Sequence, residues 1–320
     1  MSSDWIATRV AAKREEATGI YSFELVHPDG KELPAFEAGA HLDVKIGDKI
    51  RQFSIANAPG ERHRYVLGVQ RELNGRGGSA AFCDNVKEGD TVLVRGPHNL
   101  FPLAPDAEDN VLLAGGIGVT PILAMAERLQ GIGAPFVFHY CTRSRARTAF
   151  HDRVAGAEYS DKLRLHFDDG PEEQRPNLPA IIGEPTPGKH LYVCGPAVMM
   201  DVVVDLAKKQ GWPDDRVHLE RFTGVEAKPG DAREFLIEIK KTGQLVTIPA
   251  DKTVVEALRA VGIDIPVSCE QGVCATCLTN IVSGIPDHRD LILTKQEHES
   301  GKIFTPCVSR ALSDVLVIDV

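Results

Sequence analysis

The chain has 320 residues, of which 43% are hydrophobic and 25% charged, and its net charge is −9. These values are ordinary for a globular protein of two or three domains. No apolar run approaches the ~20 residues of a membrane-spanning helix, and the N-terminal segment lacks the apolar stretch of a secretory signal, so we expect a cytoplasmic protein without membrane contact. The densest basic stretch, Thr142–Arg147, is too short to indicate a nucleic-acid-binding surface.

Residues 1–105 show short patterns that are typical of β-strands. Six segments alternate apolar with polar residues and end in Gly, Pro, Asp or Asn turns. They begin at Thr8, Gly19, Ala40, Arg51, Arg64 and Asp90. We expect these strands to form a small antiparallel β-barrel.

The pattern changes to alternating strands and helices over residues 106–226. It starts with an apolar strand, a glycine turn and a helix in "NVLLAGGIGVTPILAMAERLQ", and three more apolar strands follow. An amphipathic helix is expected over Ala197–Gly211, ended by Gly211. This alternation predicts an α/β domain with a parallel sheet.

Residues Thr223–Ala232 have the composition of a linker, and a third domain is expected over residues 233–320. It opens with a hairpin pattern turned at Thr242–Gly243, followed by a helix, a cysteine-containing loop and a closing strand.

The cysteine loop carries the strongest chemical signal. Cys269, Cys274 and Cys277 have the spacing C-x4-C-x2-C, and Cys307 follows further along the chain. Four thiolates in this arrangement are the ligands of a plant-type [2Fe–2S] cluster. Structural zinc is the alternative, although only one pair fits its usual C-x2–4-C spacing tightly. Disulfides are disfavoured by a reducing cytosol and by the odd count of seven cysteines, so we predict a [2Fe–2S] cluster on these four thiols.

The segment Glu234–Val320 resembles the plant-type ferredoxin domain. The hairpin, the helix before the loop and "TPCVSRALSD" around Cys307 carry the resemblance. It implies an α+β fold of the β-grasp type. Cys83 and Cys141 lie outside this domain and are expected to be core or surface thiols.

Two glycine-containing turns in the α/β domain indicate a nucleotide site. "AGGIGVTP" (Ala114–Pro121) follows a strand and opens a helix, where backbone N–H groups favour a pyrophosphate. "YVCGP" (Tyr192–Pro196) lies at a second strand end. Together they resemble the ferredoxin-NADP reductase superfamily. The resemblance implies that Cys194 lies near the nicotinamide and helps to position hydride transfer; the alternative is an inert buried thiol. The nucleotide-binding residues expected are Gly115, Gly116, Gly118, Thr120, Pro121, Arg143, Cys194, Gly195 and Pro196.

Two motifs in the barrel resemble the flavin-binding motifs of the same superfamily. "RQFSIAN" (Arg51–Asn57) resembles R-x-[YF]-S, in which the arginine pairs with phosphate and the hydroxyl, here Ser54, reaches the reactive edge of the flavin. "NGRGGSAAF" (Asn74–Phe82) resembles the G-x-x-S turn on the flavin phosphate, an anion site of backbone N–H groups. Phe222, in "HLERF", resembles an aromatic residue that packs on the flavin, although ordinary core is an equal alternative. The flavin-binding residues expected are Arg51, Gln52, Phe53, Ser54, Arg76, Gly77, Gly78, Ser79 and Phe222, and Ser54 and Cys194 are the expected catalytic pair.

The order of the three domains resembles the phthalate dioxygenase reductase family over nearly the whole chain. That family implies FMN and NADH, and a similarity to the reductase components of vanillate O-demethylase and other Rieske oxygenases. Against NADH, Arg143, Arg145 and Arg147 follow the second strand of the α/β domain without an acidic residue, which favours NADPH, so NADPH stays open.

The implied function is electron transfer from NADH through FMN to the cluster. A separate terminal oxygenase or demethylase, acting on an aromatic or related small molecule, would take the electrons. The alternative is a flavin reductase whose C-terminal domain holds structural zinc or senses redox state. We identify no 2-His-1-carboxylate iron site in the sequence; the nearest candidate, Asp287–Asp290, is expected to be a surface turn or a docking patch.

Overall fold

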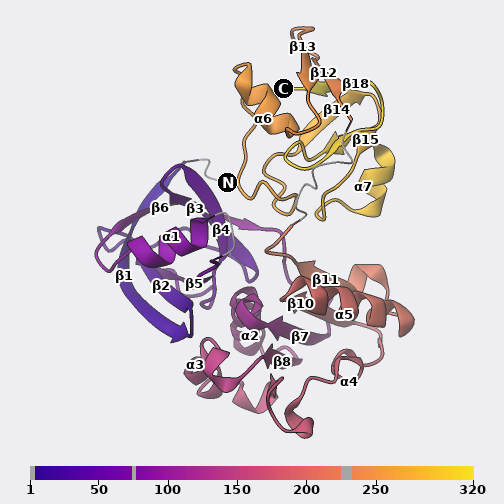
Figure 1. The fold of residues 1–320 in the computed structure, drawn as a ribbon. Helices are drawn as coiled ribbons and strands as arrows, with labels where there is room; N and C mark the ends of the chain where they lie inside the picture. The colour runs from indigo at the N-terminus through magenta and orange to yellow at the C-terminus, as the bar shows by residue number, and fades with distance from the viewer. Residues whose placement is uncertain (1–3, 74–76, 225–232) are drawn as a thin grey trace. The chain divides into compact units, whose positions relative to one another are not determined.

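The computed structural model describes residues 4–73, 77–224 and 233–320. They divide into two compact units, Met1–Glu220 and Arg221–Val320. Most of the predicted linker, and Arg76 of the predicted flavin turn, lie outside the described residues. Figure 1 shows the ribbon of these residues, with helices and strands labelled where there is room.

Six strands in the described part of the first unit form an antiparallel sheet of order β4-β3-β6-β1-β2-β5. The strands are β1 (Ile6–Ala17), β2 (Ile20–Val26), β3 (Ala40–Ile46), β4 (Lys49–Ser54), β5 (Arg64–Gln70) and β6 (Thr91–Asn99). A bridge between Ile55 and Leu67 joins the two ends of this order and closes the barrel. Its interior contains Phe23, Leu25 and Phe82, the last from helix α1 (Gly78–Asn85). The six predicted strands and the barrel are confirmed.

A second sheet in this unit is parallel, with order β11-β10-β7-β8-β9. Its strands are β7 (Asp109–Gly115), β8 (Phe136–Thr142), β9 (Leu163–Phe167), β10 (Lys189–Cys194) and β11 (Val217–Glu220). The α-helices are α2 (Val119–Gly131), α3 (His151–Ala155), α4 (Leu178–Ile182) and α5 (Ala197–Lys209). The 3-10 turns are η1 (Gly116–Gly118), η2 (Arg145–Arg147), η3 (Ser160–Lys162), η4 (Glu172–Gln174) and η5 (Asp214–Arg216). Alternate residues of one strand face opposite sides of this sheet: Leu112 of β7 packs in the core that includes α2, and Val111 in the core that includes α4 and α5. The predicted α/β architecture is confirmed.

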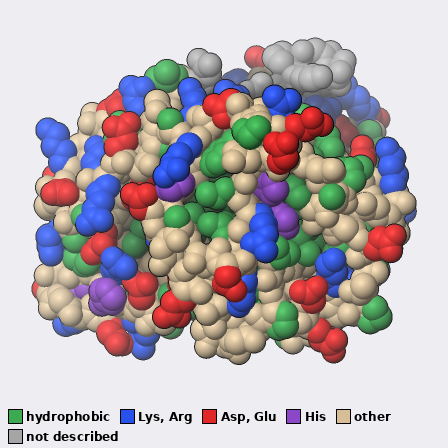
Figure 2. Space-filling view, turned by 90° about the horizontal axis from the view of Figure 1, so that it is seen from below, with side chains coloured by type: hydrophobic (Ala, Val, Ile, Leu, Met, Phe, Trp, Pro, Cys, Tyr) green, Lys and Arg blue, Asp and Glu red, His purple; other side chains and the backbone are tan. Residues whose placement is uncertain are grey.

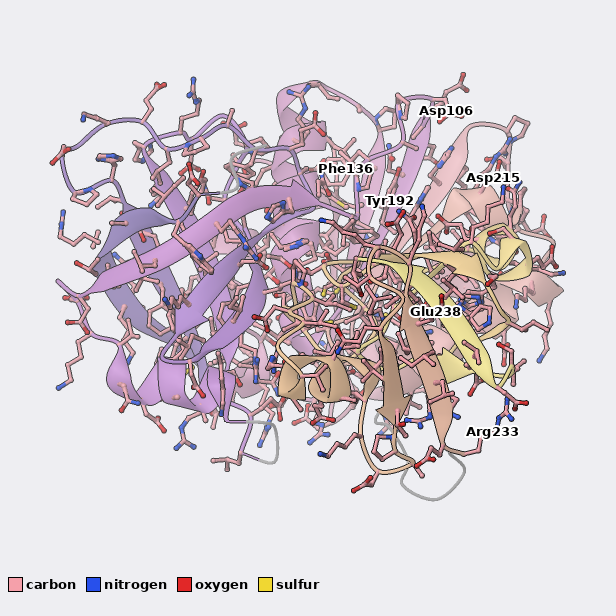
Figure 3. All side chains as sticks on the ribbon, turned by 90° about the horizontal axis from the view of Figure 1, so that it is seen from above. Asp106, Phe136, Tyr192, Asp215, Arg233 and Glu238 are labelled. Carbon is pink, nitrogen blue, oxygen red and sulfur yellow. The ribbon has the colours of Figure 1, made fainter. Side chains whose placement is uncertain are left out.

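The barrel and the parallel sheet share one core. Ala38 and Phe101, from the barrel and the loop that follows it, pack in the same cluster as Leu123 of α2. The hydroxyl of Tyr192, labelled in Figure 3, accepts a hydrogen bond from the Ala104 amide at 2.8 Å. The barrel and the parallel sheet therefore form one compact unit, while the predicted domain boundaries at 105 and 226 stay a prediction.

The second unit contains a mixed sheet of order β13-β12-β18-β14-β16 and, beside it, the short pair β15-β17. The strands are β12 (Phe235–Ile239), β13 (Leu245–Ile248), β14 (Thr279–Ser283), β15 (Pro286–Asp287), β16 (Ile303–Phe304), β17 (Arg310–Ala311) and β18 (Val315–Asp319), with helices α6 (Val254–Ala260) and α7 (Lys295–Ser300). The β12–β13 hairpin turns through Gly243, whose φ of 69° favours glycine. Thr253 and Thr294 begin the two helices with capping boxes. This α+β arrangement agrees with the predicted ferredoxin-like domain.

No helix among the described residues is long and apolar enough to cross a membrane. On the face shown in Figure 2, acidic and basic side chains are interspersed, without a continuous basic area.

Candidate functional site

The four cysteines predicted to bind the cluster come together in the second unit. The Sγ atoms of Cys277 and Cys307 lie 3.3 Å apart, although the two residues are 30 positions apart in the chain. The Cys269 amide donates to Cys274 Sγ at 3.4 Å. These four cysteines are buried free thiols, as are Cys83, Cys141 and Cys194. A buried group of four sulfurs without a disulfide fits an iron–sulfur cluster, and Cys83 and Cys141 are core thiols.

The backbone of the cysteine loop is wound tightly enough to aim donors at sulfur. Glu270, Gly272 and Ala275 have positive φ values of 51°, 71° and 58°. Only the glycine adopts this conformation without strain, so the loop holds two unfavourable residues in place. The Gln271 amide donates to Cys269 Sγ at 3.3 Å. Such contacts to ligand atoms are the ones that tune a bound cluster.

Within each of the two thiol pairs, one pKa is lowered and the other is raised. A hydrogen bond from Cys269 lowers the pKa of Cys274 to about 6, against the opposing effect of burial, and Thr276 lowers it further from 3.2 Å. A hydrogen bond from Cys307 likewise lowers the pKa of Cys277. Because thiolates are the metal ligands, the lowered pKa of one sulfur in each pair favours metal binding.

The two predicted flavin motifs meet in the barrel. A Cβ on Gly78 would lie 2.5 Å from Nε of Arg51, so only glycine leaves room for the arginine side chain across the start of α1. Gly77 precedes the helix in the left-handed conformation and offers no capping side chain. The Lys49 ammonium lies 3.6 Å from the position of a Cβ on Gly77. Two cations beside uncapped helix N–H groups fit a phosphate.

The other residues of these motifs are placed around this point. Phe53 packs on Phe82 of α1, with ring centroids 5.5 Å apart. Gln52 donates to Asp43 Oδ1 at 3.1 Å, so its amide is engaged within the barrel. The Ser79 hydroxyl accepts from the Glu72 amide at 3.3 Å. Phe53 and Gln52 therefore secure β4, while Ser79 connects α1 to the chain before it.

The two predicted catalytic residues come together through a third residue that the sequence analysis missed. The Ser54 hydroxyl donates to Oε2 of Glu220 at 3.3 Å. Glu220 pairs with Cys194 in the register of β10 and β11. Loss of hydration raises the pKa of Glu220 to about 8, and the Ser54 hydrogen bond opposes this only in part. Burial, with Glu220 nearby, raises the pKa of Cys194 well above its ordinary value.

The site therefore presents a hydroxyl, a neutral thiol and a carboxyl group that is protonated at pH 7. Glu220 lies in the motif "HLERF", in which only the aromatic residue, Phe222, was predicted to have a role. A signal was available, since an acidic residue at the end of an apolar strand of a parallel sheet lies where ligands bind in such folds.

The two glycine turns of the predicted nucleotide site touch one another. A Cβ on Gly118 would lie 2.2 Å from the Cys194 carbonyl oxygen, and a Cβ on Gly195 would lie 3.0 Å from Gly115 Cα. Pro196 is also adjacent, since its Cδ would be 2.7 Å from a Cβ on Gly115. Gly116, with φ 53°, makes the turn itself. The backbones of the two turns thus lie close together, and the side chains of Pro196 and Met199 pack against the same glycines.

Thr120, Pro121 and Arg143 are less closely grouped. Thr120 is buried, and its methyl group would be 2.5 Å from a Cβ on Gly68 of the barrel. Pro121 is buried in the first turn of α2. Arg143 is exposed after β8, as are Arg145 and Arg147 of η2. Thr120 and Pro121 therefore lie in the packed part of the turn, whereas the three arginines are exposed.

Phe222 belongs to the second unit and is 39% exposed, so the alternative that it is ordinary core is wrong. Two residues later, Gly224 runs against the cysteine loop: a Cβ there would lie 1.8 Å from the Gln271 carbonyl oxygen. The exposed ring is thus connected by a short piece of backbone to the cysteine loop.

The segment Asp287–Asp290 was expected to be a surface turn or a docking patch, and the structure corrects the first of these. The Asp290 side chain has no exposed surface and that of His288 is 10% exposed, so these two residues are not part of a surface turn. Asp287, in contrast, forms an ion pair with Arg289 at 2.6 Å. The sequence analysis missed the reason, which is that His298 of α7 lies 3.3 Å from Asp290 and completes a buried polar group.

A closed barrel, a parallel sheet with two facing glycine turns and a domain with four converging cysteines define the class of modular iron–sulfur oxidoreductases. The model of the 2Fe-2S iron-sulfur cluster binding domain matches residues 237–312, which include all four cysteines. Two relatives match almost end to end. The chain is 46% identical over 311 residues to vanillate O-demethylase oxidoreductase of Pseudomonas sp. strain HR199, covering 97% of this chain and 98% of the relative. It is 39% identical over 317 residues to phthalate dioxygenase reductase of Burkholderia cepacia, covering 98% and 97%.

Comparison with solved structures finds the same fold. A phthalate dioxygenase reductase, described as modular for electron transfer from pyridine nucleotides to [2Fe-2S], superposes with a TM-score of 0.75 at 39% identity and covers 99% of this chain and 98% of its own. A type IV self-sufficient cytochrome P450 monooxygenase gives 0.87 at 36% identity, and the match spans 99% of this chain but 41% of that longer one. The chain belongs to the phthalate dioxygenase reductase family, as the domain order predicted.

Proposed function

We propose that this chain is the reductase component of a multicomponent oxygenase system, and that it passes electrons from NADH through FMN to a [2Fe–2S] cluster. The observation that carries the proposal is the convergence of four buried cysteines in a chain that also holds the Ser54–Glu220–Cys194 group. When bound, a flavin accepts two electrons as a hydride and releases them singly, which is what a one-electron cluster requires.

The residues of the chain divide this work. Arg51, Lys49 and the N–H groups that follow Gly77 bind the FMN phosphate. FMN, which ends at that phosphate, is proposed over FAD because the family resemblance implies it. The Ser54 hydroxyl faces the reactive edge of the flavin, and the assignment of Phe222 to the flavin rests on the resemblance of "HLERF" alone.

Cys194 and Glu220 act in their neutral forms. The raised pKa of Cys194 keeps the thiol protonated. The side chain therefore packs beside the nicotinamide as a small uncharged group and does not act as a nucleophile. Protonated Glu220 accepts the Ser54 hydrogen bond without placing a full negative charge there. The pair therefore orients the reacting groups and excludes water.

The cluster is the last electron carrier within this protein. It is held by Cys269, Cys274, Cys277 and Cys307, and the Gln271 amide and the Thr276 hydroxyl contact the sulfurs. The electron acceptor is a separate terminal oxygenase or demethylase of the Rieske type that acts on an aromatic or related small molecule. The names of the relatives support this: they include vanillate O-demethylase oxidoreductase and a phthalate 4,5-dioxygenase reductase subunit. A cytoplasmic location is part of the same proposal.

Metal and flavin analysis of the purified protein, followed by kinetics with NADH and NADPH, tests the proposal. We expect two irons and one FMN per chain, and reduction of a one-electron acceptor with a higher kcat/KM for NADH. Zinc in place of iron, or flavin reduction without one-electron transfer, would favour the flavin-reductase alternative.

The exposed arginines after β8 sharpen the nucleotide assignment. Replacing Arg143 and Arg145 by Ala lowers kcat/KM for NADPH more than for NADH if these side chains reach a 2′-phosphate. An equal change for both nucleotides would show that the arginines do not discriminate between them.

A further inference from the structure

The polar group formed by His288, Asp290 and His298 lies outside the cluster ligands. All three offer ligand atoms within 4.8 Å of one another. His298 Nε2 lies 3.3 Å from Asp290 Oδ1, and His288 Nδ1 lies 3.7 Å from that same oxygen. One carboxylate oxygen is thus faced by two imidazoles that come from separate segments, the turn before Asp290 and helix α7.

His288 provides an independent observation. Its side chain is 10% exposed, and neither ring nitrogen has a hydrogen-bond partner. Buried polar groups are nearly always partnered, so an imidazole with two unsatisfied nitrogens beside a carboxylate points to a ligand at that position. The two imidazole rings are stacked with centroids 4.2 Å apart, so His298 does not satisfy His288 edge-on.

Asp290 is held in place by the rest of the domain. Its Oδ2 accepts from the Leu293 amide at 2.8 Å and from the Ile292 amide at 3.3 Å, and His298 Nε2 lies 3.3 Å from this oxygen as well as from Oδ1. Although burial alone would raise the pKa of Asp290, these hydrogen bonds and His298 lower it, so the group is ionised. Loss of hydration and the neighbouring His298 lower the pKa of His288, so that ring is neutral at pH 7. An ionised carboxylate and a neutral imidazole are the forms that bind metals.

We propose that His288, Asp290 and His298 form a binding site for one divalent transition-metal ion, separate from the iron–sulfur cluster. Two imidazoles and one carboxylate suit Zn²⁺, Fe²⁺, Co²⁺ or Ni²⁺, and the absence of sulfur distinguishes this donor set from the four cysteines. Ligands bonded at 2.0–2.1 Å around one metal lie about 3.3 Å apart in tetrahedral geometry. The two distances to Asp290 Oδ1 approach this value, and the ring of His298, one-third exposed, can turn to complete the set.

The site is connected to the cluster loop through the backbone. The Leu291 amide donates to the Gly272 carbonyl at 3.0 Å, and a Cβ on Gly272 would lie 3.0 Å from Asp290 Cα. An ion on Asp290 would therefore join α7 to the segment that supports the cysteine loop. The proposal does not depend on which nucleotide, flavin or partner the chain uses.

Cobalt binding to the oxidised holoprotein tests the site. An oxidised [2Fe–2S] cluster and an oxidised flavin give no electron paramagnetic resonance signal, so a high-spin Co²⁺ signal reports the added ion alone. We expect one Co²⁺ per chain after desalting, measured by elemental analysis, with competition by Zn²⁺. His298→Ala should weaken binding at least tenfold, as should His298→Gln, which keeps a polar side chain of similar length.

Glu299→Ala is the matched control. Glu299 is an exposed carboxylate on the same helix, adjacent in sequence to His298 and outside the ligand set, so its loss should leave binding unchanged. Unchanged cluster absorption in each variant shows that the domain is intact. The proposal is overturned by a wild-type protein that retains no Co²⁺, or by equal retention in wild type and both His298 variants. A loss as large in Glu299→Ala would assign the binding to surface charge and overturn it as well.

Discussion

The cysteine loop and Cys194 place the same side chain in opposite electrostatic settings. In the loop, a thiol donates to its neighbour, and the pKa of Cys274 falls to about 6. No residue in the described part of the chain donates to Cys194 in this way, and burial and the nearby Glu220 raise its pKa. Both settings are buried, so burial alone does not decide protonation. In the loop, the thiols that receive a hydrogen bond from another thiol, Cys274 and Cys277, have lowered pKa values, while the donating thiols, Cys269 and Cys307, have raised ones.

The largest expected effect comes from removing one cluster sulfur. Cys307→Ser should abolish one-electron transfer, because the cluster loses a ligand, while flavin reduction by NADH continues in the first unit. Stopped-flow absorbance of flavin reduction, together with steady-state reduction of a one-electron acceptor, measures both steps. Cys83→Ser, at a buried thiol outside the domain, should retain both. Loss of flavin reduction in Cys307→Ser would show that the two sites are not separable.

Arg51→Ala should weaken FMN binding by about 10- to 100-fold, since hydrogen bonds to charged groups contribute roughly 1.5–3 kcal/mol. Fluorescence titration of the flavin-free protein measures the affinity. Arg62→Ala is the control: Arg62 forms an exposed ion pair with Glu32 at 2.9 Å and should not change binding. Equal affinities in the wild type and Arg51→Ala would place the phosphate elsewhere.

Glu220→Gln should change how stability depends on pH. The pKa of Glu220 rises on folding from about 4.5 to about 8, so the folded state holds the proton more tightly than the unfolded state. Wild-type stability should therefore fall as pH rises from about 5 to 8 and then level off. Glutamine does not titrate, so the free energy of unfolding of the variant rises relative to that of the wild type across this pH range. The expected rise is on the order of 2 kcal/mol after allowance for partial exposure. Thermal unfolding followed by circular dichroism at pH 6 and pH 9 measures the difference, and a constant difference would contradict the raised pKa.

Thr276→Val should have the smallest effect. Its hydroxyl contact with Cys274 Sγ favours added negative charge on the cluster, so its loss should lower the reduction potential by about 20–60 mV, the equivalent of one ordinary hydrogen bond. Redox titration monitored by visible absorption measures the shift. Thr276→Ser keeps the hydroxyl and should restore the potential; an unrestored potential would assign the change to packing.

The cysteine loop and the region around Cys194 also differ in how much of each could be predicted from the sequence. Three cluster ligands fall within nine residues and Cys307 follows in the same domain, so the spacing of the four cysteines predicted the cluster, and the family resemblance supported it. The strands of the barrel and of the parallel sheet were likewise visible, because alternation and apolar runs are local properties.

Glu220 and His298 were not visible, because their roles depend on contacts between distant segments. Glu220 meets Ser54 across 166 positions, and β11, which ends at Glu220, is a four-residue strand without a distinctive pattern. His298 belongs to a polar helix whose sequence indicates a solvated surface, and only folding places it on Asp290. Buried polar groups that form through tertiary contact leave no periodic trace.

The contact between Gly118 and the Cys194 carbonyl bears on how this scaffold can be engineered. The two turns are fitted backbone to backbone, so no side chain can be introduced at Gly118 without displacing the Cys194 backbone. The arginines that follow β8 are exposed and make no such contact. Cofactor preference can accordingly be redesigned on that outer segment while the inner turns stay fixed, and libraries that vary the two regions together would mostly sample broken sites.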